Sequence, residues 1–518
     1  LNKLLIRILL HLQVEFSIKV YLCLHKSFGM KKRLLLFFSV CFAGLTLLAS
    51  SPKYEMRAVW LTTNWGLDWP SRPMHTPVNA RRQQQELVEI LDRLQALGIN
   101  TVFFQARIRG EVFYPSQYEP WAAVLSGGRN PGYDPLALIV DECHKRAMEC
   151  HAWLVTFPVG SNRQVKRQGS RSVVARHRSW CKQLAGEWYL DPGNPEVRDY
   201  LVGVVDEIVT KYDVDGIHLD YVRYPDDARR FPDADSYRKW GRGATSLMNW
   251  REDNITATVS VIYDKVKQLK PWVKVSSSPL GRYASLPGFP AWWSCREAVH
   301  QDPKRWLQEG KHDFIAPMMY FKEENYFPFL HDWAESCPAG SVASGIGVYR
   351  LDRENGNWSL DEIKRQIETT RQVGVGQAYF RYGNLHRHTA LEQWLTAWFY
   401  RYPALTPRPV GAPAQTVAAP EGLRGEMVVG STRLSWQPVD AAFTYVVYAT
   451  DDSLRVEDGK QIAAVLPRTA SEWILPGSYR CYAVVARDRY GNESIPVVWH
   501  SPTVEPEKYE IKLYSHKK

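Results

Sequence analysis

The fold is decided by the stretch YDVDGIHLDYVRYP, which occupies residues 212–225. This stretch predicts a short buried strand that begins at Gly216 and ends before Pro225. Glycine permits a tight start to the strand, and proline cannot continue a ladder of backbone hydrogen bonds. We therefore take this strand as the reference point for the elements on either side.

Side chains alternate along a strand, so Ile217 and Leu219 lie on one face, and His218 and Asp220 lie on the other. A carboxylate and an imidazole are costly to bury without partners. Where these two groups face a pocket near the carboxyl end of a strand, they could take part in binding or catalysis. The alternative is that Asp220 only caps the following loop.

Strands and helices alternate on both sides of this stretch. Strands are predicted at residues 57–62, 100–105, 151–156, 273–277, 314–320, 342–348 and 377–380. Helices are predicted at residues 81–97, 135–147, 254–269, 303–308, 329–334, 360–372 and 391–400, and another begins at Asn194. Eight such units over residues 53–402 predict an α/β fold, a (β/α)₈ TIM barrel. A doubly wound open sheet is the alternative, without a glycine-rich phosphate loop to support it.

The composition and the periodicity of the sequence change at residue 403. Residues 403–420 are rich in Pro and Ala and predict a linker. Residues 421–503 alternate with a period of two between turns, which predicts an all-β sandwich. The strand around Trp436 and the turn at 491–494 resemble a fibronectin type III module. Residues 504–518 form a charged tail.

Composition and charge narrow the class of protein. The chain has 518 residues, 45% hydrophobic and 23% charged, which is typical of a globular protein. Much of its formal net charge of +10 lies in the first 50 residues, and no long basic block follows, so nucleic acid is not an expected partner.

The start of the chain predicts export. A basic segment at 30–33 precedes an apolar run at 34–48 and small residues, which is the pattern of a signal peptide over residues 30–50. Residues 1–29 are then an extension from an early start assignment, with Met30 as the true start. We expect a periplasmic or secreted protein with no membrane span.

The cysteines beyond the signal are scattered, at positions 143, 150, 181, 295, 337 and 481. They show neither a disulfide framework nor the spacing of a metal site, so we expect free, buried thiols. The sequence predicts no cofactor and no metal. It sets no oligomeric state and is compatible with a monomer.

Polar and aromatic residues follow several of the predicted strands, and reactive groups of a barrel collect at the carboxyl ends of its strands. The candidate substrate-binding residues are Trp60, Trp65, Asp68, Arg107, His151, Trp153, His218, Arg223, Tyr320 and Tyr382. Each aromatic ring, taken singly, is better explained by core or loop packing than by sugar binding. Their clustering with carboxylates predicts a sugar site, because pyranose faces stack on rings and sugar hydroxyls need directional partners.

Cleavage of a glycosidic bond needs two carboxyl groups, one ionised and one protonated. We expect Asp220 to be the ionised one, as nucleophile or base. Glu111 is the first candidate for the acid and Glu323 the second.

Several stretches resemble the bacterial secreted glycosyl-hydrolase-like family ten. They are MRAVWLTT (56–63), GINTVFFQAR (98–107), GYDPL (132–136), DPGNPEVR (191–198), DGIHLDY (215–221) and SPLG (278–281), in the expected order over roughly residues 55–400. The resemblance implies a barrel distantly like the amylases, the activity of a glycoside hydrolase, and for some relatives cleavage of peptidoglycan glycan strands. In the amylase comparison, the aspartate of the fourth strand, here Asp220, is the nucleophile.

This sequence departs from the family and amylase patterns in places. Ser278-Pro279-Leu280-Gly281 stands where the amylase comparison would put an acid glutamate, Tyr221 where a second Asp is common, and Met318 where a Gln is usual. These changes leave three hypotheses: a glycoside hydrolase acting on a wall glycan or related polysaccharide, an inactive barrel that binds glycans, and an unrelated metal-dependent hydrolase.

Overall fold

The computed structural model describes residues 51–74 and 76–502. The predicted upstream extension (1–29), the signal peptide (30–50) and the charged tail (504–518) lie outside the described residues. Within the described part, no helix combines the length and the apolar character needed to cross a bilayer.

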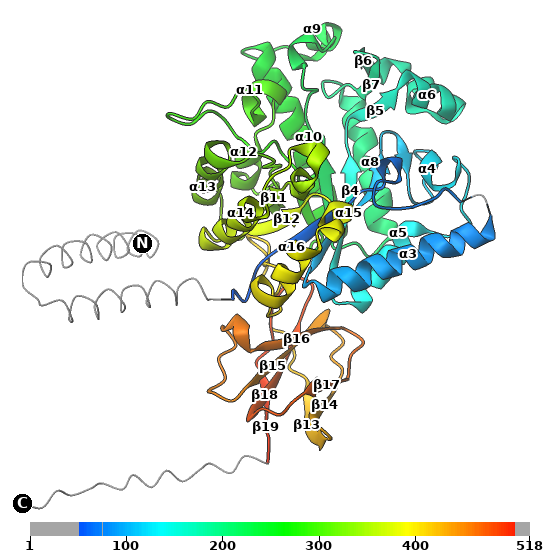
Figure 1. The fold of residues 1–518 in the computed structure, drawn as a ribbon. Coiled ribbons are helices and arrows are strands. Elements are labelled where there is room, and N and C mark those ends of the chain that lie inside the picture. The colour runs from blue at the N-terminus through cyan, green and yellow to red at the C-terminus, as the bar shows by residue number, and fades with distance from the viewer. Residues whose placement is uncertain (1–50, 75, 503–518) are drawn as a thin grey trace, which may run out of the picture. The chain divides into compact units, whose positions relative to one another are not determined.

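Eight parallel strands form the barrel (Figure 1). Going around the barrel from one side to the other, they are β10 (Phe314–Ile315), β9 (Lys274–Ser277), β8 (Gly216–Asp220), β4 (Glu149–Val155), β2 (Thr101–Ile108), β1 (Arg57–Leu61), β12 (Gly376–Tyr379) and β11 (Ala343–Ile346). A bridge between Ile315 and Val342 joins the two outer strands and closes the ring. The predicted TIM barrel is confirmed, and the open sheet is excluded.

The helices that cover the barrel follow its strands, as predicted. They are α3 (Pro77–Ala96), α5 (Pro135–Lys145), α8 (Pro195–Lys211), α10 (Leu247–Leu269), α12 (Pro303–Gln308), α13 (Phe327–Ser336), α14 (Leu360–Gln372) and α16 (Thr389–Trp394). The side chains of Asp134 and Asn194 accept backbone hydrogen bonds at the starts of α5 and α8, at 3.1 and 3.0 Å. Helix α10 begins earlier than predicted because Ser246 caps it by accepting from the Asn249 amide at 3.1 Å.

Shorter elements decorate the barrel. The helices are α4 (Ala123–Ser126), α6 (Asn162–Gln168), α7 (Val173–Arg176), α9 (Ala234–Trp240), α11 (Cys295–Val299) and α15 (Tyr382–Arg387). Strand β3 (Glu111–Val112) pairs with β2, and β5 (Pro158–Ser161), β7 (Glu187–Leu190) and β6 (Cys181–Leu184) form a small antiparallel sheet. No strand was predicted from the sequence in this last region.

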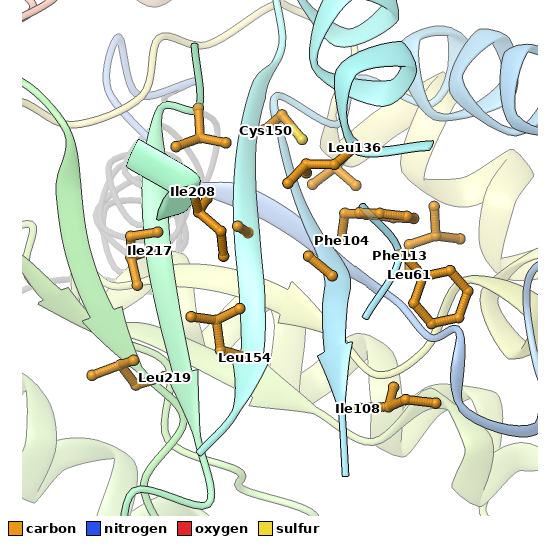
Figure 2. Close-up of a cluster of buried hydrophobic side chains, with 14 of the residues drawn as sticks. Leu61, Phe104, Ile108, Phe113, Leu136, Cys150, Leu154, Ile208, Ile217 and Leu219 are labelled. Carbon is orange, nitrogen blue, oxygen red and sulfur yellow. The ribbon is translucent and has the colours of Figure 1, made fainter. Parts of the chain in front are cut away.

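Apolar side chains on the outer faces of the strands pack against the helices (Figure 2). Ile217 and Leu219 of β8 lie in this layer with Leu154 of β4 and Ile208 of α8, as the alternation on β8 predicts. All six cysteines of the described chain are buried and unpaired, in agreement with the expected free thiols. The barrel thus obtains its main hydrophobic core outside the ring of strands.

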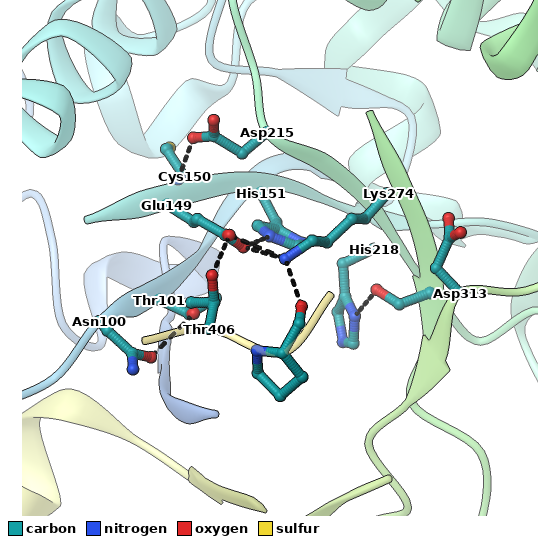
Figure 3. Close-up of polar contacts among 12 residues, drawn as sticks. Asn100, Thr101, Glu149, Cys150, His151, Asp215, His218, Lys274, Asp313 and Thr406 are labelled. Carbon is teal, nitrogen blue, oxygen red and sulfur yellow. Dashed lines mark hydrogen bonds and ion pairs between the residues drawn. The ribbon is translucent and has the colours of Figure 1, made fainter. Parts of the chain in front are cut away.

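The inside of the barrel is partly polar. Lys274 of β9 donates to both carboxylate oxygens of Glu149 on β4, at 2.7 and 2.9 Å, and both residues are buried (Figure 3). Burial opposes ionisation of Glu149, but Lys274 and His151 outweigh it and hold the pKa of this carboxyl below its usual value. This ion pair sits at the amino-terminal ends of its strands.

Strand β10 is shorter than predicted, with two residues instead of seven. Pro317 lacks an amide hydrogen and cannot donate to a ladder. The chain beyond Ile315 instead makes single contacts with both neighbours, since Met318 donates to Pro279 at 2.9 Å and Gly345 donates to Pro317 at 2.8 Å.

The C-terminal part is all β, as predicted. One sheet holds β13 (Glu421–Val428), β14 (Ser431–Gln437) and β17 (Glu472–Pro476). The other holds β16 (Ile462–Pro467), β15 (Thr444–Thr450), β18 (Cys481–Arg487) and β19 (Val497–His500). Residues of both sheets share one core, which makes a sandwich. Its likeness to fibronectin type III stays a prediction.

The start of the predicted linker is held in place. Leu405 exchanges backbone hydrogen bonds with Lys53 and Glu55, at 2.8 and 2.9 Å. The Thr406 hydroxyl donates to Glu149 at 2.5 Å, and Arg487 of β18 donates to the Thr406 carbonyl at 2.7 Å. Residues 405 and 406 therefore join the barrel to the sandwich and are not a free spacer.

Gly216 serves a purpose other than the tight start expected from the sequence. A Cβ atom at this position would lie 2.2 Å from Nδ1 of His151, inside the barrel. Glycine is required here because β4 and β8 approach closely and the imidazole fills the space.

We predict that Gly216→Ala destabilises the fold by about 1–3 kcal/mol through overpacking. Chemical denaturation measures this loss. In a His151→Ala background the space is vacated, so Gly216→Ala should cost less there than in the wild type. Equal costs in the two backgrounds would contradict the steric explanation.

Candidate active site

Asp220 is the last residue of β8, on the inner face of the barrel, with 6% of its surface exposed. Its Oδ1 accepts hydrogen bonds from the Ser278 hydroxyl at 2.9 Å and from the Tyr221 amide at 2.8 Å. Its Oδ2 accepts from Nε1 of Trp153 at 3.1 Å. These donors, from three neighbouring strand ends, hold the carboxylate in one orientation.

Opposing effects act on the pKa of Asp220. Burial raises the pKa of its carboxyl above the ordinary value, while Arg223 and the three hydrogen bonds oppose that rise. Arg223 is itself buried and lies over the Tyr221 ring, at 4.4 Å from the ring centre. Its Nε and Nη1 atoms have no hydrogen-bond partner in the described chain. Arg223 therefore supplies positive potential without locking Asp220 into an ion pair.

Aromatic rings line the same end of the barrel. Tyr320 follows β10, and its ring centre lies 5.6 Å from that of Tyr349 and 5.4 Å from that of Phe380. Burial raises the pKa of Tyr320 well above its ordinary value, and Tyr349 and Asp220 add to the rise. The Tyr320 hydroxyl is buried and lacks a partner in the described chain. The structure thus brings Tyr320, Arg223, Trp153 and Asp220 together.

The two candidate acids lie in other surroundings. Glu111 is buried, where it accepts from Arg167 at 2.8 Å and from the Ala123 amide at 3.2 Å. Glu323 has a side chain that is 60% exposed and pairs with Arg365 at 2.8 Å. Among the described residues, no carboxylate is hydrogen-bonded to Asp220 or to its three donors. The structure does not bring a second carboxyl group into contact with Asp220.

His218, His151 and Trp60 lie deeper in the barrel than the sequence indicated. His218 accepts from the Trp60 indole at 3.1 Å, contacts the Ser276 hydroxyl at 2.9 Å and stacks on Phe103. Burial lowers the pKa of His218 well below its ordinary value, and nearby His151 and His312 add to this effect. These side chains fill the barrel interior beneath Asp220.

Arg107 and Asp68 hold the loops around the site in place. Arg107 binds Glu119 through two hydrogen bonds, at 2.6 and 2.7 Å, and donates to the Thr156 carbonyl at 2.9 Å. Asp68 pairs with Arg381 and accepts from the Gly383 amide at 2.7 Å. Arg107 fixes the chain that follows β4, and Asp68 ties the loop after β1 to that after β12.

The two remaining candidates follow β1 and β12. Trp65 is 69% exposed, in the loop after β1. Tyr382 is buried and stacks on His386, with ring centres 5.8 Å apart.

Sequence reasoning missed the contact of Ser278 with Asp220. Ser276 and Ser278 follow the inward alternation of β9, and that signal would have found it.

A closed parallel barrel that carries a buried carboxylate and aromatic rings at the carboxyl ends of its strands fits the class of barrel glycoside hydrolases. The comparison with known families agrees with this class. The chain belongs to the family described as Glycosyl hydrolase-like 10, whose model matches residues 55–339.

Two relatives and one solved structure are similar to this chain. The glycosyl hydrolase YngK of Bacillus subtilis is 33% identical over 377 residues, which are 68% of this chain and 73% of that protein. The glycosyl hydrolase DigH of Escherichia coli K12 is 37% identical over 352 residues, 61% of this chain and 80% of that protein. The PgaB (BpsB) glycoside hydrolase domain of Bordetella bronchiseptica aligns over 68% of this chain and 100% of its own, with a TM-score of 0.47 and 15% identity.

The buried imidazoles predict a loss of stability in mild acid. Burial lowers the pKa of His218 well below its ordinary value, and that of His312 to about 4. Below about pH 6.5 the unfolded chain binds protons that the folded chain does not, so the free energy of unfolding should fall as the pH drops from about 6.5 to about 4.5. Urea unfolding at a series of pH values measures this slope.

The variant His218→Gln should reduce the slope by up to one proton, about 1.4 kcal/mol per pH unit. The exposed His331 provides the control, because His331→Gln should leave the slope unchanged. A slope that is equal in all three proteins would contradict the assignment to His218.

Proposed function

We propose that this protein hydrolyses O-glycosidic bonds in a bacterial cell-wall glycan, with Asp220 as the reacting carboxylate. The supporting observation is the position of Asp220 at the end of β8, oriented by three donors beneath a face of aromatic rings. The family and the names of the relatives support the reaction class. The substrate, peptidoglycan strands or a related polysaccharide, is proposed from the family resemblance and from the predicted export.

The arrangement suits Asp220 to act on an anomeric centre. Its ionised oxygen either attacks the anomeric carbon or removes a proton from the attacking water. The glycosidic C–O bond breaks, and the departing sugar oxygen takes up a proton to leave as a hydroxyl group. Burial raises the pKa of the Asp220 carboxyl and makes the carboxylate more basic, while Arg223 opposes that rise and favours the ionised form. The Tyr320 hydroxyl, which lacks a partner in the described chain, is placed to donate to a sugar oxygen.

Binding of glycans without cleavage is the second candidate function. It is favoured by the positions of Glu111 and Glu323, which pair with Arg167 and Arg365 and do not contact Asp220. A hydrolase of this kind needs a proton donor for the departing sugar oxygen. The assay for Asp220 below separates the two functions.

Export remains part of the proposal, because residues 30–50 lie outside the described chain. Deletion of residues 30–50 should retain the protein in the cytoplasm, and cell fractionation with an antibody against the barrel would measure this.

We predict that Asp220→Asn lowers the release of reducing ends from peptidoglycan glycan strands by at least about 10²-fold, because amide nitrogen and oxygen cannot replace an ionised carboxylate. The control is Asp141→Asn, which changes an aspartate with a side chain 63% exposed on α5 and should keep full activity. Full activity of Asp220→Asn would exclude Asp220. Binding of the strands by a wild type that releases no ends would favour the second function.

The pH dependence of the reaction should report the charge of Arg223. Arg223 lowers the pKa of Asp220, so Arg223→Met should raise it and move the acid limb of the kcat/KM profile to higher pH. Arg223→Lys keeps the charge and should move the limb less. An acid limb that stays in place in Arg223→Met would contradict the proposed coupling.

A further inference from the structure

A concave surface lies near the proposed active site. It is a cleft of about 600 Å³ between the segment that follows β8 and the segment that leads into α11. Its lining includes Asp226, Leu247, Met248, Trp292, Trp293 and Glu297. The Trp292 side chain is 91% exposed, although indole is the largest apolar group that a protein can bury. An exposed indole next to a cleft indicates that the cleft binds a ligand or a partner.

We propose that this cleft is an additional sugar-binding subsite, which holds further units of the glycan chain whose scissile bond lies at Asp220. This inference rests on the proposed function and specifies its substrate as a long chain. The occupant is thus a saccharide of several units, bound by ring stacking and by carboxylates.

The polar groups of the cleft fit sugar hydroxyls. Asp226 accepts from the Trp293 indole at 3.3 Å, and Glu297 accepts from the Ser294 hydroxyl at 3.4 Å. Within the described chain, neither carboxylate forms an ion pair with a cation. Each therefore keeps acceptor capacity for a hydroxyl donor, next to an aromatic face.

The cleft offers a ring and hydrogen-bond acceptors but no free buried arginine: of the two arginines in its lining, Arg229 is exposed and Arg251 is buried. The most buried cation of its lining, Arg251, already binds Asp233 through two hydrogen bonds, at 2.7 and 2.9 Å. That pairing neutralises the guanidinium and leaves Asp226 and Glu297 facing the cleft. The apolar face and the hydroxyl groups of a sugar ring match an indole flanked by these carboxylates.

The cleft is continuous with the Asp220 site through one side chain. The Trp293 ring centre lies 6.0 Å from the Arg223 guanidinium, which in turn lies 4.4 Å from the Tyr221 ring centre. Arg223 is also the cation that acts on Asp220. A chain bound at Asp220 would thus reach Trp293 and then Trp292 along one wall.

The variant Trp292→Ala tests the subsite, and Trp398→Ala is its control. Trp398 is 68% exposed in the turn Leu395–Phe399, outside the lining of the cleft. We measure release of reducing ends from peptidoglycan glycan strands freed of stem peptides and sorted by length. Trp292→Ala should lower kcat/KM for long strands about three- to tenfold, through KM, and leave the shortest cleaved strand within about twofold. Trp398→Ala should match the wild type on both.

Two outcomes separate the subsite from the proposed function. If Trp292→Ala equals the wild type on long strands, the subsite is wrong while hydrolysis stands. If the wild type cleaves no strand, hydrolysis is wrong, and the subsite is judged by binding of long strands to Asp220→Asn and to Asp220→Asn/Trp292→Ala. Equal binding by these two variants would overturn the subsite as well.

Discussion

The buried ion pair of Lys274 and Glu149 is the constraint on which the barrel depends. A buried ion is costly unless it is paired, so β4 and β9 must place these two side chains inward and opposite each other. A register shift of one residue on either strand would point the charged side chain into the apolar layer beneath the helices. The same inward alternation leads along β8 from Gly216 through His218 to Asp220. The position of the candidate carboxylate therefore follows from a pair at the opposite end of the strands.

Much of the fold could be predicted because its signals are local. The caps at Asp134 and Asn194 and the alternation on β8 each depend on a few neighbouring residues, and the structure confirms them. The depth of a residue along the barrel is not local, because it depends on where a strand ends. His218 is two residues before the end of β8, about 6–7 Å deeper than Asp220, and it was therefore wrongly expected at the mouth.

Partners that are distant in sequence limited the prediction of the site. Arg107 and Asp68 have the residue types of a sugar site, but Glu119 and Arg381 already occupy them. Asp68 and Arg381 are 313 positions apart, so the sequence contains no sign of their pairing. Glu111 and Glu323 likewise form ion pairs with arginines. The residue type shows what a side chain can do, and only the fold shows whether it is free to do it.

Arg223 is one of the buried groups that this barrel leaves without hydrogen-bond partners. Most buried polar groups of the site have partners, yet two of its nitrogens and the Tyr320 hydroxyl have none in the described chain. A buried donor without a partner costs about 1–3 kcal/mol, so three such donors at one place are a local loss of stability. Water or sugar oxygens in the mouth would recover that loss. Because Arg223 also faces Trp293, a glycan that reaches from Asp220 into the cleft would pass the very donors that the protein leaves unsatisfied.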